Sequence, residues 1–178
     1  MNVLLNVVVF KIAWLSTVLG GANDLPLVGP VVVMGAIAIH LWLAVEPARE
    51  LLLVLITGVI GVTWDSFMVS AGWLSYPSGV FISGVAPYWI VAMWMLFATT
   101  LNVSFRWLQQ RLWLAAIMGA VFGPLSYYAG ASAGAVVLHD PSAAFTGLSI
   151  AWAIMLPSLL WLAQQLDGTQ RPVLKSRI

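Results

Sequence analysis

Six apolar stretches follow one another along the chain, and short polar or turn-forming segments separate them. They cover residues 2–20, 26–45, 50–70, 86–105, 111–130 and 143–163. A helix of about 20 apolar residues is long enough to cross the hydrocarbon core of a bilayer. The pattern predicts an all-α polytopic membrane protein, with six transmembrane helices in a single bundle over residues 1–163. Residues 164–178 are expected to form a polar cytoplasmic tail.

The segment after the third stretch, GWLSYPSGVFISGV, is longer than the other connections. It combines Gly, Ser and Pro with four apolar or aromatic residues, Trp73, Tyr76, Phe81 and Ile82. Loops with this mixture occur as lids or as re-entrant segments that are buried against protein. We expect an outward-facing pocket beneath residues 72–85.

Composition supports a membrane location. The chain is 62% hydrophobic and only 7% charged, with a mean hydropathy of +1.00. A soluble domain carries about 25% charged residues, so this chain has too few to cover a soluble globule. No basic stripe is present, which excludes nucleic acid as a partner. The absence of cysteine excludes disulfides, thiolate metal sites and cysteine nucleophiles.

Basic residues predict the orientation of the bundle. Six of the seven fall in segments that lie on one side of a six-span protein: Arg49, Arg106, Arg111, Arg171, Lys175 and Arg177. Positive residues are retained on the cytoplasmic side of a membrane. We therefore expect a multi-pass membrane protein with both termini in the cytoplasm.

One carboxylate, Asp65, falls deep in the third stretch. Helix geometry puts it about 22 Å into a hydrocarbon core about 30 Å thick. Gly58, Gly61 and Gly72 share its helical face, and small residues allow helices to approach closely. This face is predicted to point into the bundle. Charged residues within a membrane usually pair with one another or mark a functional site. Lys11 of the first stretch is therefore a candidate partner of Asp65. The alternative is that the Lys11 side chain extends to the membrane interface.

The fifth stretch carries a second small-residue motif, Gly119 and Gly123, at GxxxG spacing. We expect these glycines to contact a neighbouring helix, with the Gly58–Gly61 face as the favoured partner. Ser126 and Tyr127 follow a helix-kinking proline and lie at about the depth of Asp65. The Tyr127 hydroxyl is expected to donate to the Asp65 carboxylate, although a kinked packing helix with interfacial tyrosines explains the pattern equally well.

Six of the ten tryptophans fall near predicted membrane interfaces, where aromatic belts form: Trp42, Trp107, Trp113 and Trp161 inside, Trp73 and Trp89 outside. Trp14, Trp64, Trp94 and Trp152 lie deeper, either as packing residues or as the lining of an aromatic cavity. The predicted ligand-binding set is Asp65, Ser66, Trp64, Ser126, Tyr127, Lys11, Trp14, Trp94 and Asn102.

No catalytic, metal-binding or cofactor-binding residue is predicted. His40 and Glu46 fall on different helical faces, and an isolated pair such as His139 and Asp140 is too common to indicate zinc. The chain lacks HExxH, GxSxG, P-loop and Rossmann patterns. Asn102 is expected to bridge helices more readily than to bind a ligand.

Several segments together resemble a known family. These are NVVVFKIAWLSTVLGGA, VTWDSFMVSAGWLSYP, APYWIVAMWMLFATTLNVSFRWL and GAVFGPLSYYAGASAGA, in this order. The chain resembles, through Trp161, the DUF2878 family of small bacterial inner-membrane proteins. That family has no established activity, so the resemblance implies no catalytic role. It implies a membrane-lipid context, because relatives are often encoded near lipid-modifying enzymes of the cyclopropane-fatty-acid-synthase type.

Three functions fit these features. The first is a binding or transport component for a small hydrophobic or amphipathic molecule or a membrane lipid, by analogy with substrate-binding subunits of vitamin transporters. The second is a scaffold that brings lipid-modifying enzymes, as membrane-protein partners, to the membrane. The third is an intramembrane enzyme that uses Asp65 as an acid or base, which is disfavoured because no nucleophile or oxyanion donors accompany it.

Overall fold

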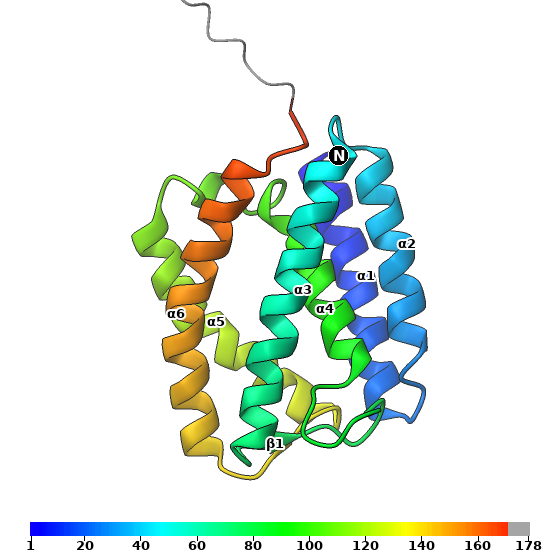
Figure 1. The fold of residues 1–178 in the computed structure, drawn as a ribbon, viewed down its shortest axis with the longest axis vertical. Helices are drawn as coiled ribbons and strands as arrows, with labels where there is room; N and C mark the ends of the chain where they lie inside the picture. Colours follow the sequence, from blue (N-terminus) through cyan, green and yellow to red (C-terminus); the bar gives the residue numbers. More distant parts are fainter. Residues whose placement is uncertain (171–178) are drawn as a thin grey trace, which may run out of the picture.

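The computed structural model describes residues 1–170 as a bundle of α-helices (Figure 1). The helices are α1 (Val3–Ala22), α2 (Val28–Trp42), α3 (Pro47–Ser70), α4 (Tyr88–Leu101), α5 (Leu112–Ser132) and α6 (Pro141–Gln165), with a 3₁₀ turn at Arg106–Leu108. Each of the six predicted stretches corresponds to one helix. The part of the predicted tail that carries Arg171, Lys175 and Arg177 lies outside the described residues.

Successive helices run in alternating directions, so both chain ends of the described part lie at the same end of the bundle (Figure 1). Four helices, α1, α3, α5 and α6, are long and apolar enough to cross a membrane. Helices α2 and α4 are shorter, with 15 and 14 residues. Length and composition therefore identify four membrane-spanning candidates where the sequence pattern predicts six.

The distribution of polarity is that of a protein surrounded by lipid. Large apolar side chains cover the outside, for example Leu4, Met34 and Ile154, which are 74%, 71% and 63% exposed. The carboxyl side chains of Asp65 and Glu50 are instead completely buried, and the amides of Asn6 and Asn102 are nearly so. Buried polar groups must find hydrogen-bond partners inside the protein, and such groups organise both candidate sites described below.

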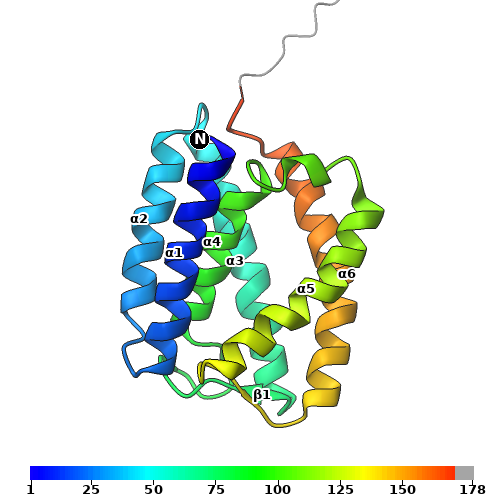
Figure 2. The ribbon, with the colours of Figure 1, turned by 180° about the vertical axis from the view of Figure 1, so that it is seen from behind.

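The bundle consists of two parts. Helices α1 to α4 pack together, and α5 pairs with α6 as a hairpin beside them (Figure 2). The hairpin is held by close contact at two glycines, since a Cβ atom at Gly119 would lie 2.1 Å from the backbone oxygen of Trp152. At Gly123 it would lie 2.4 Å from the Trp152 ring.

The predicted partner of this motif was wrong. Gly119 and Gly123 pack on α6 and not on the Gly58–Gly61 face of α3, which faces Met95 and Trp94 of α4. The reason is that each glycine pair accommodates a large side chain from the other helix. Two smooth glycine faces packed together would leave no room to bury an indole ring.

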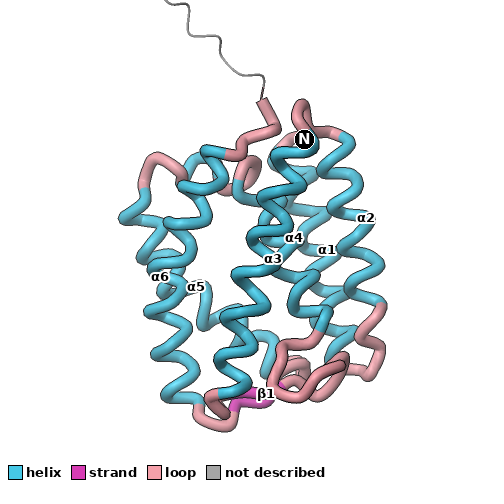
Figure 3. The backbone as a smooth tube through the Cα atoms, viewed as in Figure 1, coloured by secondary structure: helices cyan, strands magenta, loops and turns pink. Residues whose placement is uncertain are grey.

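Two long connections meet at the end opposite the N-terminus (Figure 3). A short antiparallel pairing joins them, with β1 (Leu74–Ser75) opposite β2 (Val137–Leu138). The connection between α3 and α4 folds back into the bundle: the Ser78 hydroxyl donates to the Gly21 carbonyl at 2.6 Å, and the Trp89 indole donates to the Ser78 carbonyl at 3.0 Å. Trp89 is only 1% exposed, so it is a core residue, and its predicted place in an interfacial aromatic belt was wrong.

Candidate functional site

Asp65 is the centre of a closed hydrogen-bond cluster. Its side chain has no exposed surface and accepts hydrogen bonds from three elements. The Trp94 indole of α4 donates to Oδ2 at 2.6 Å, and the Tyr127 hydroxyl of α5 donates to Oδ1 at 2.7 Å. The Tyr76 hydroxyl, from the α3–α4 connection, also donates to Oδ1. Three donors to one buried carboxylate compensate the cost of removing it from water.

Local sequence explains this geometry. Gly61 lies one helical turn before Asp65, and a Cβ there would be 2.0 Å from the Trp94 ring, so only glycine lets the indole lie against α3. Tyr76 reaches the carboxylate because the connection turns inward, and the Ser66 hydroxyl fixes its far end by accepting from the Ala86 backbone N–H at 3.0 Å. The predicted hydrogen bond from Tyr127 is present. The sequence did not identify Tyr76 as a partner.

Lys11 does not pair with Asp65. Within residues 1–170 the ion pairs are His40 with Glu50, Arg49 with Glu46, and Arg106 with Asp167. The Lys11 side chain is exposed, and its Nζ lies 5.7 Å from the centre of the Trp14 ring, within reach of a cation–π interaction. The carboxyl group is instead stabilised by hydrogen bonds from hydroxyl and indole donors, and the ammonium group takes no part in the cluster.

A cavity of about 500 Å³ lies beside the Asp65 cluster. Helices α1, α4, α5 and α6 line it, together with residues 135–136 from the connection between α5 and α6. Its aromatic wall is continuous: the Trp94 and Trp152 rings are stacked, with centroids 4.9 Å apart, and Phe97 packs edge-on against both. An apolar concave site of this volume is typical of a small-molecule pocket.

The cavity includes some of the predicted site residues and excludes others. Lys11, Trp14, Trp94, Ser126 and Tyr127 line it. Asp65, Trp64, Ser66 and Asn102 do not, and neither does any residue of the connection 72–85. The sequence predicted a pocket around Asp65 and beneath residues 72–85, whereas neither Asp65 nor this connection lines the cavity. The carboxylate lies behind Trp94 and Tyr127, which turn their polar atoms to Asp65 and their rings to the cavity.

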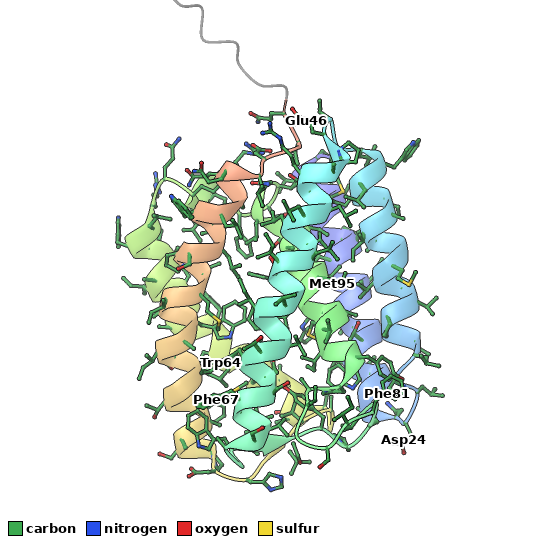
Figure 4. All side chains as sticks on the ribbon, viewed as in Figure 1. Asp24, Glu46, Trp64, Phe67, Phe81 and Met95 are labelled. Carbon is green, nitrogen blue, oxygen red and sulfur yellow. The ribbon has the colours of Figure 1, made fainter. Side chains whose placement is uncertain are left out.

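Trp64 lies elsewhere on α3. Its ring packs on Phe67, with centroids 5.6 Å apart, and both residues lie on the side of α3 that faces α6 (Figure 4). The buried indole N–H of Trp64 has no hydrogen-bond partner among the described residues. Phe67 in turn packs edge-on against Trp73, whose ring occupies the space beside Gly147 of α6. This aromatic group joins α3 to α6 outside the cavity.

A second buried cluster surrounds Glu50, at the end of the bundle that carries the N-terminus. Its Oε2 lies 2.8 Å from His40 Nε2. Its Oε1 accepts from Asn102 Nδ2 at 2.9 Å and from the Gly168 backbone N–H at 2.8 Å. The sequence pattern does not reveal this cluster, because the partner of His40 is Glu50 and not Glu46. The one available signal was a carboxylate in the first turn of an apolar helix.

The same end holds the segment that follows α6. Arg106 forms an ion pair with Asp167 at 2.7 Å and donates to the Thr169 hydroxyl at 2.5 Å. Partial burial opposes ionisation of Asp167, but hydrogen bonds from Arg106 and Thr169 outweigh it and hold the pKa of this carboxyl below its usual value of 3.8. The Gly168 carbonyl accepts from the N–H groups of Val45 and Glu46. These contacts fasten residues 167–169 across the ends of α2, α3 and α4.

One family matches the chain over residues 3–158, and its description reads "Protein of unknown function (DUF2878)". No curated protein and no solved structure matches the chain.

Proposed function

The chain belongs to the DUF2878 family, and we propose that it is a six-span protein of the bacterial inner membrane that binds a small hydrophobic or amphipathic molecule in the cavity between its two parts. In this proposal both termini are cytoplasmic and the protein acts as a binding or transport component. The observation that carries the proposal is the apolar cavity of about 500 Å³ with its stacked tryptophan wall.

The charge distribution supports the membrane orientation. Arg49 lies in the first turn of α3, and Arg106 and Arg111 lie between α4 and α5. These segments are at the end of the bundle that carries the N-terminus (Figure 1). No Lys or Arg occurs in the connections at the opposite end, residues 23–27, 71–87 and 133–140. This asymmetry is the one expected when the N-terminal end faces the cytoplasm.

The short helices α2 and α4 are compatible with six spans. Non-helical backbone is tolerated at membrane depth where protein covers it. The first part of the connection after α3 satisfies this condition, because Leu74, Tyr76 and Ser78 are buried and the hydroxyls of Tyr76 and Ser78 are hydrogen-bonded within the protein. Residues 80–83 are exposed at the end of the bundle.

The entrance to the cavity supports an apolar ligand. Phe122 and Leu125 of α5 line the cavity and are still 59% and 51% exposed, and Lys11 of α1 is also exposed. The cavity therefore reaches the surface between α1 and α5. In the proposed orientation this surface faces hydrocarbon. A ligand therefore enters directly from the bilayer, without passing through a water-filled channel.

The state of Asp65 disfavours an enzyme. A catalytic acid or base must come within hydrogen-bond distance of the substrate. Asp65 has no exposed surface, does not line the cavity and already accepts three hydrogen bonds. Its role in the proposal is to fix the orientation of Trp94 and Tyr127, which form the wall.

Narrowing the cavity tests the proposal. Met118→Trp places a larger side chain on the cavity wall, and Ile117→Trp is the matched control because Ile117 is 54% exposed and does not line the cavity. The wild type and both variants are purified in mild detergent, and retained molecules are identified by native mass spectrometry. The wild type and Ile117→Trp should carry a ligand that Met118→Trp has lost. A wild type without ligand, or an equally loaded Met118→Trp, would overturn the proposal, and the former result would favour a scaffold.

A further inference from the structure

Among residues 1–170, Lys11 is the only charged residue that lines the cavity. It lies eight residues into α1, about 12 Å from the start of the helix and therefore within the hydrocarbon core of the proposed orientation. A lysine at this depth costs about 3 kcal/mol on insertion scales, and such residues usually have a partner or a function. No carboxylate of the described chain pairs with it.

Three of the other polar side chains in the wall are hydrogen-bonded within the protein. The Ser126 hydroxyl donates to the Gly123 carbonyl at 2.7 Å. Tyr127 and Trp94 donate to Asp65. The buried indole N–H of Trp152 also lacks a partner among the described residues. Lys11 is the one lining group there that carries a charge, and a bound anion would supply both a counter-charge and a hydrogen-bond acceptor.

Lys11 also has a defined place along the cavity. With Phe10 and Phe105 it lies toward the N-terminal end of the bundle, whereas Val18 and Val136 line the opposite end. On α5 the lining runs from Met118 to Gly130, which corresponds to a length on the order of 18 Å. Apart from Ser126, whose hydroxyl is bonded within α5, the rest of this length is apolar or aromatic. The cavity therefore has one cationic end and a long apolar body.

This shape selects an amphiphile. A volume of about 500 Å³ accommodates one acyl or alkyl chain but not the two chains of a phospholipid. The cationic end favours an anionic headgroup, because an ammonium group donates hydrogen bonds and its charge strengthens the bond most when the acceptor is negative. The lateral entrance between α1 and α5 lets such a molecule diffuse in from the membrane with its chain still in an apolar environment.

On the basis of the proposed binding function, we infer that the ligand is a single-chain amphiphile with an anionic headgroup and that Lys11 holds this headgroup. A carboxylate and a phosphate monoester both present the required chemistry. The chain lies along the Trp94–Trp152 wall toward Val136.

The test compares three ligands of equal chain length: hexadecanoate, hexadecyl phosphate and methyl hexadecanoate, which has no charge. Binding to the full-length protein in nanodiscs is followed by tryptophan fluorescence, because Trp14, Trp94 and Trp152 line the cavity. The wild type should bind at least one of the two anions about tenfold more tightly than the ester, the usual magnitude for a charge-assisted hydrogen bond. The tighter anion identifies the headgroup.

Lys11→Met should abolish the preference for the anion and leave binding of the ester unchanged, which also shows that the variant is folded. Lys11→Arg should keep the preference. An equally tight ester in the wild type, or an unchanged preference in Lys11→Met, would overturn the inference.

Met118→Trp separates this inference from the proposed function. If Met118→Trp weakens all three ligands while Lys11→Met changes nothing, the cavity binds apolar molecules and only the role of Lys11 is refuted. If Met118→Trp weakens none, or the wild type binds none, the proposed function fails together with this inference.

Discussion

Trp94 and Asp65 form a single unit in the wall of the cavity. The Trp94 indole N–H donates to the Asp65 carboxylate at 2.6 Å, and the same indole ring stacks on Trp152. Gly61 provides the space that the ring requires. A buried carboxylate thereby controls the shape of an apolar surface that it does not touch. This accounts for a carboxylate deep in a helix whose other charged residues, Arg49 and Glu50, lie in its first turn.

The Asp65→Asn variant should be destabilised. An amide replaces one accepting oxygen by a donor, so at least one of Tyr76, Tyr127 and Trp94 faces a donor and loses its hydrogen bond. A buried donor without a partner costs about 1–3 kcal/mol. Thermal unfolding in detergent measures this, with Thr63→Val as the control, because Thr63 is exposed and its hydroxyl bonds only within its own helix. Equal stability of Asp65→Asn and wild type would contradict the cluster.

Adding Lys11→Met to Asp65→Asn should not restore stability. Lys11 contributes none of the hydrogen bonds to Asp65, so the two effects are expected to add within about 0.5 kcal/mol. A double-mutant cycle measures the coupling. Recovery of most of the lost stability would show that the two charges pair in the membrane.

Gly119→Ala should separate α5 from α6. The new Cβ would lie 2.1 Å from the Trp152 backbone oxygen, which cannot move without shifting the helix. Overpacking of this kind costs about 1–3 kcal/mol. Gly35→Ala is the control, since its Cβ meets no atom within 4 Å and alanine stabilises a helix relative to glycine. The two variants should change the unfolding temperature in opposite directions.

Replacement of Glu50 should release the segment after α6. Glu50→Ala leaves His40, Asn102 and the Gly168 N–H without their acceptor and should cost on the order of 3 kcal/mol. Glu50→Gln should cost less, because the amide oxygen still accepts and the amide N–H₂ can donate to His40 in its other tautomer.

The control for Glu50 is Glu46→Gln, which removes a partly exposed pair with Arg49 that contributes little. Thermal unfolding and hydrogen exchange at Gly168 and Thr169 report the two effects. Exchange at these amides that is unchanged in Glu50→Ala would show that Glu50 does not hold the segment.

The proposed topology predicts which surface residues react from outside the cell. The chain has no cysteine, so single cysteines can be introduced without background. Ser83 and Ser142 are both exposed at the end opposite the N-terminus. Cysteines at these two positions should react with an impermeant maleimide in sealed spheroplasts. Cysteines at Ala48 and Gln110 should react only after lysis. Reaction of the latter pair in sealed spheroplasts would refute the orientation.

Much of the secondary structure could be read from the sequence, because it depends on properties that vary along one dimension. The length of each apolar stretch gave the six helices to within a few residues at either end, as for α1 at Val3–Ala22 against a predicted 2–20. The spacing of Gly58, Gly61 and Asp65 identified the buried face of α3. The matching depth of Tyr127 correctly indicated its hydrogen bond to Asp65.

Which side chains meet was decided only by the tertiary structure. A pattern gives the face that a helix buries, but not the helix that covers it, so the sequence paired Gly119 with α3 where the structure places Trp152 of α6. Depth alone likewise could not distinguish Lys11 from Tyr76 as the partner of Asp65, because Tyr76 reaches it through a connection that turns inward. The Glu50 cluster depends on residues as far apart as His40 and Gly168. Such contacts follow from the rotation and packing of whole helices, which residue spacing does not encode.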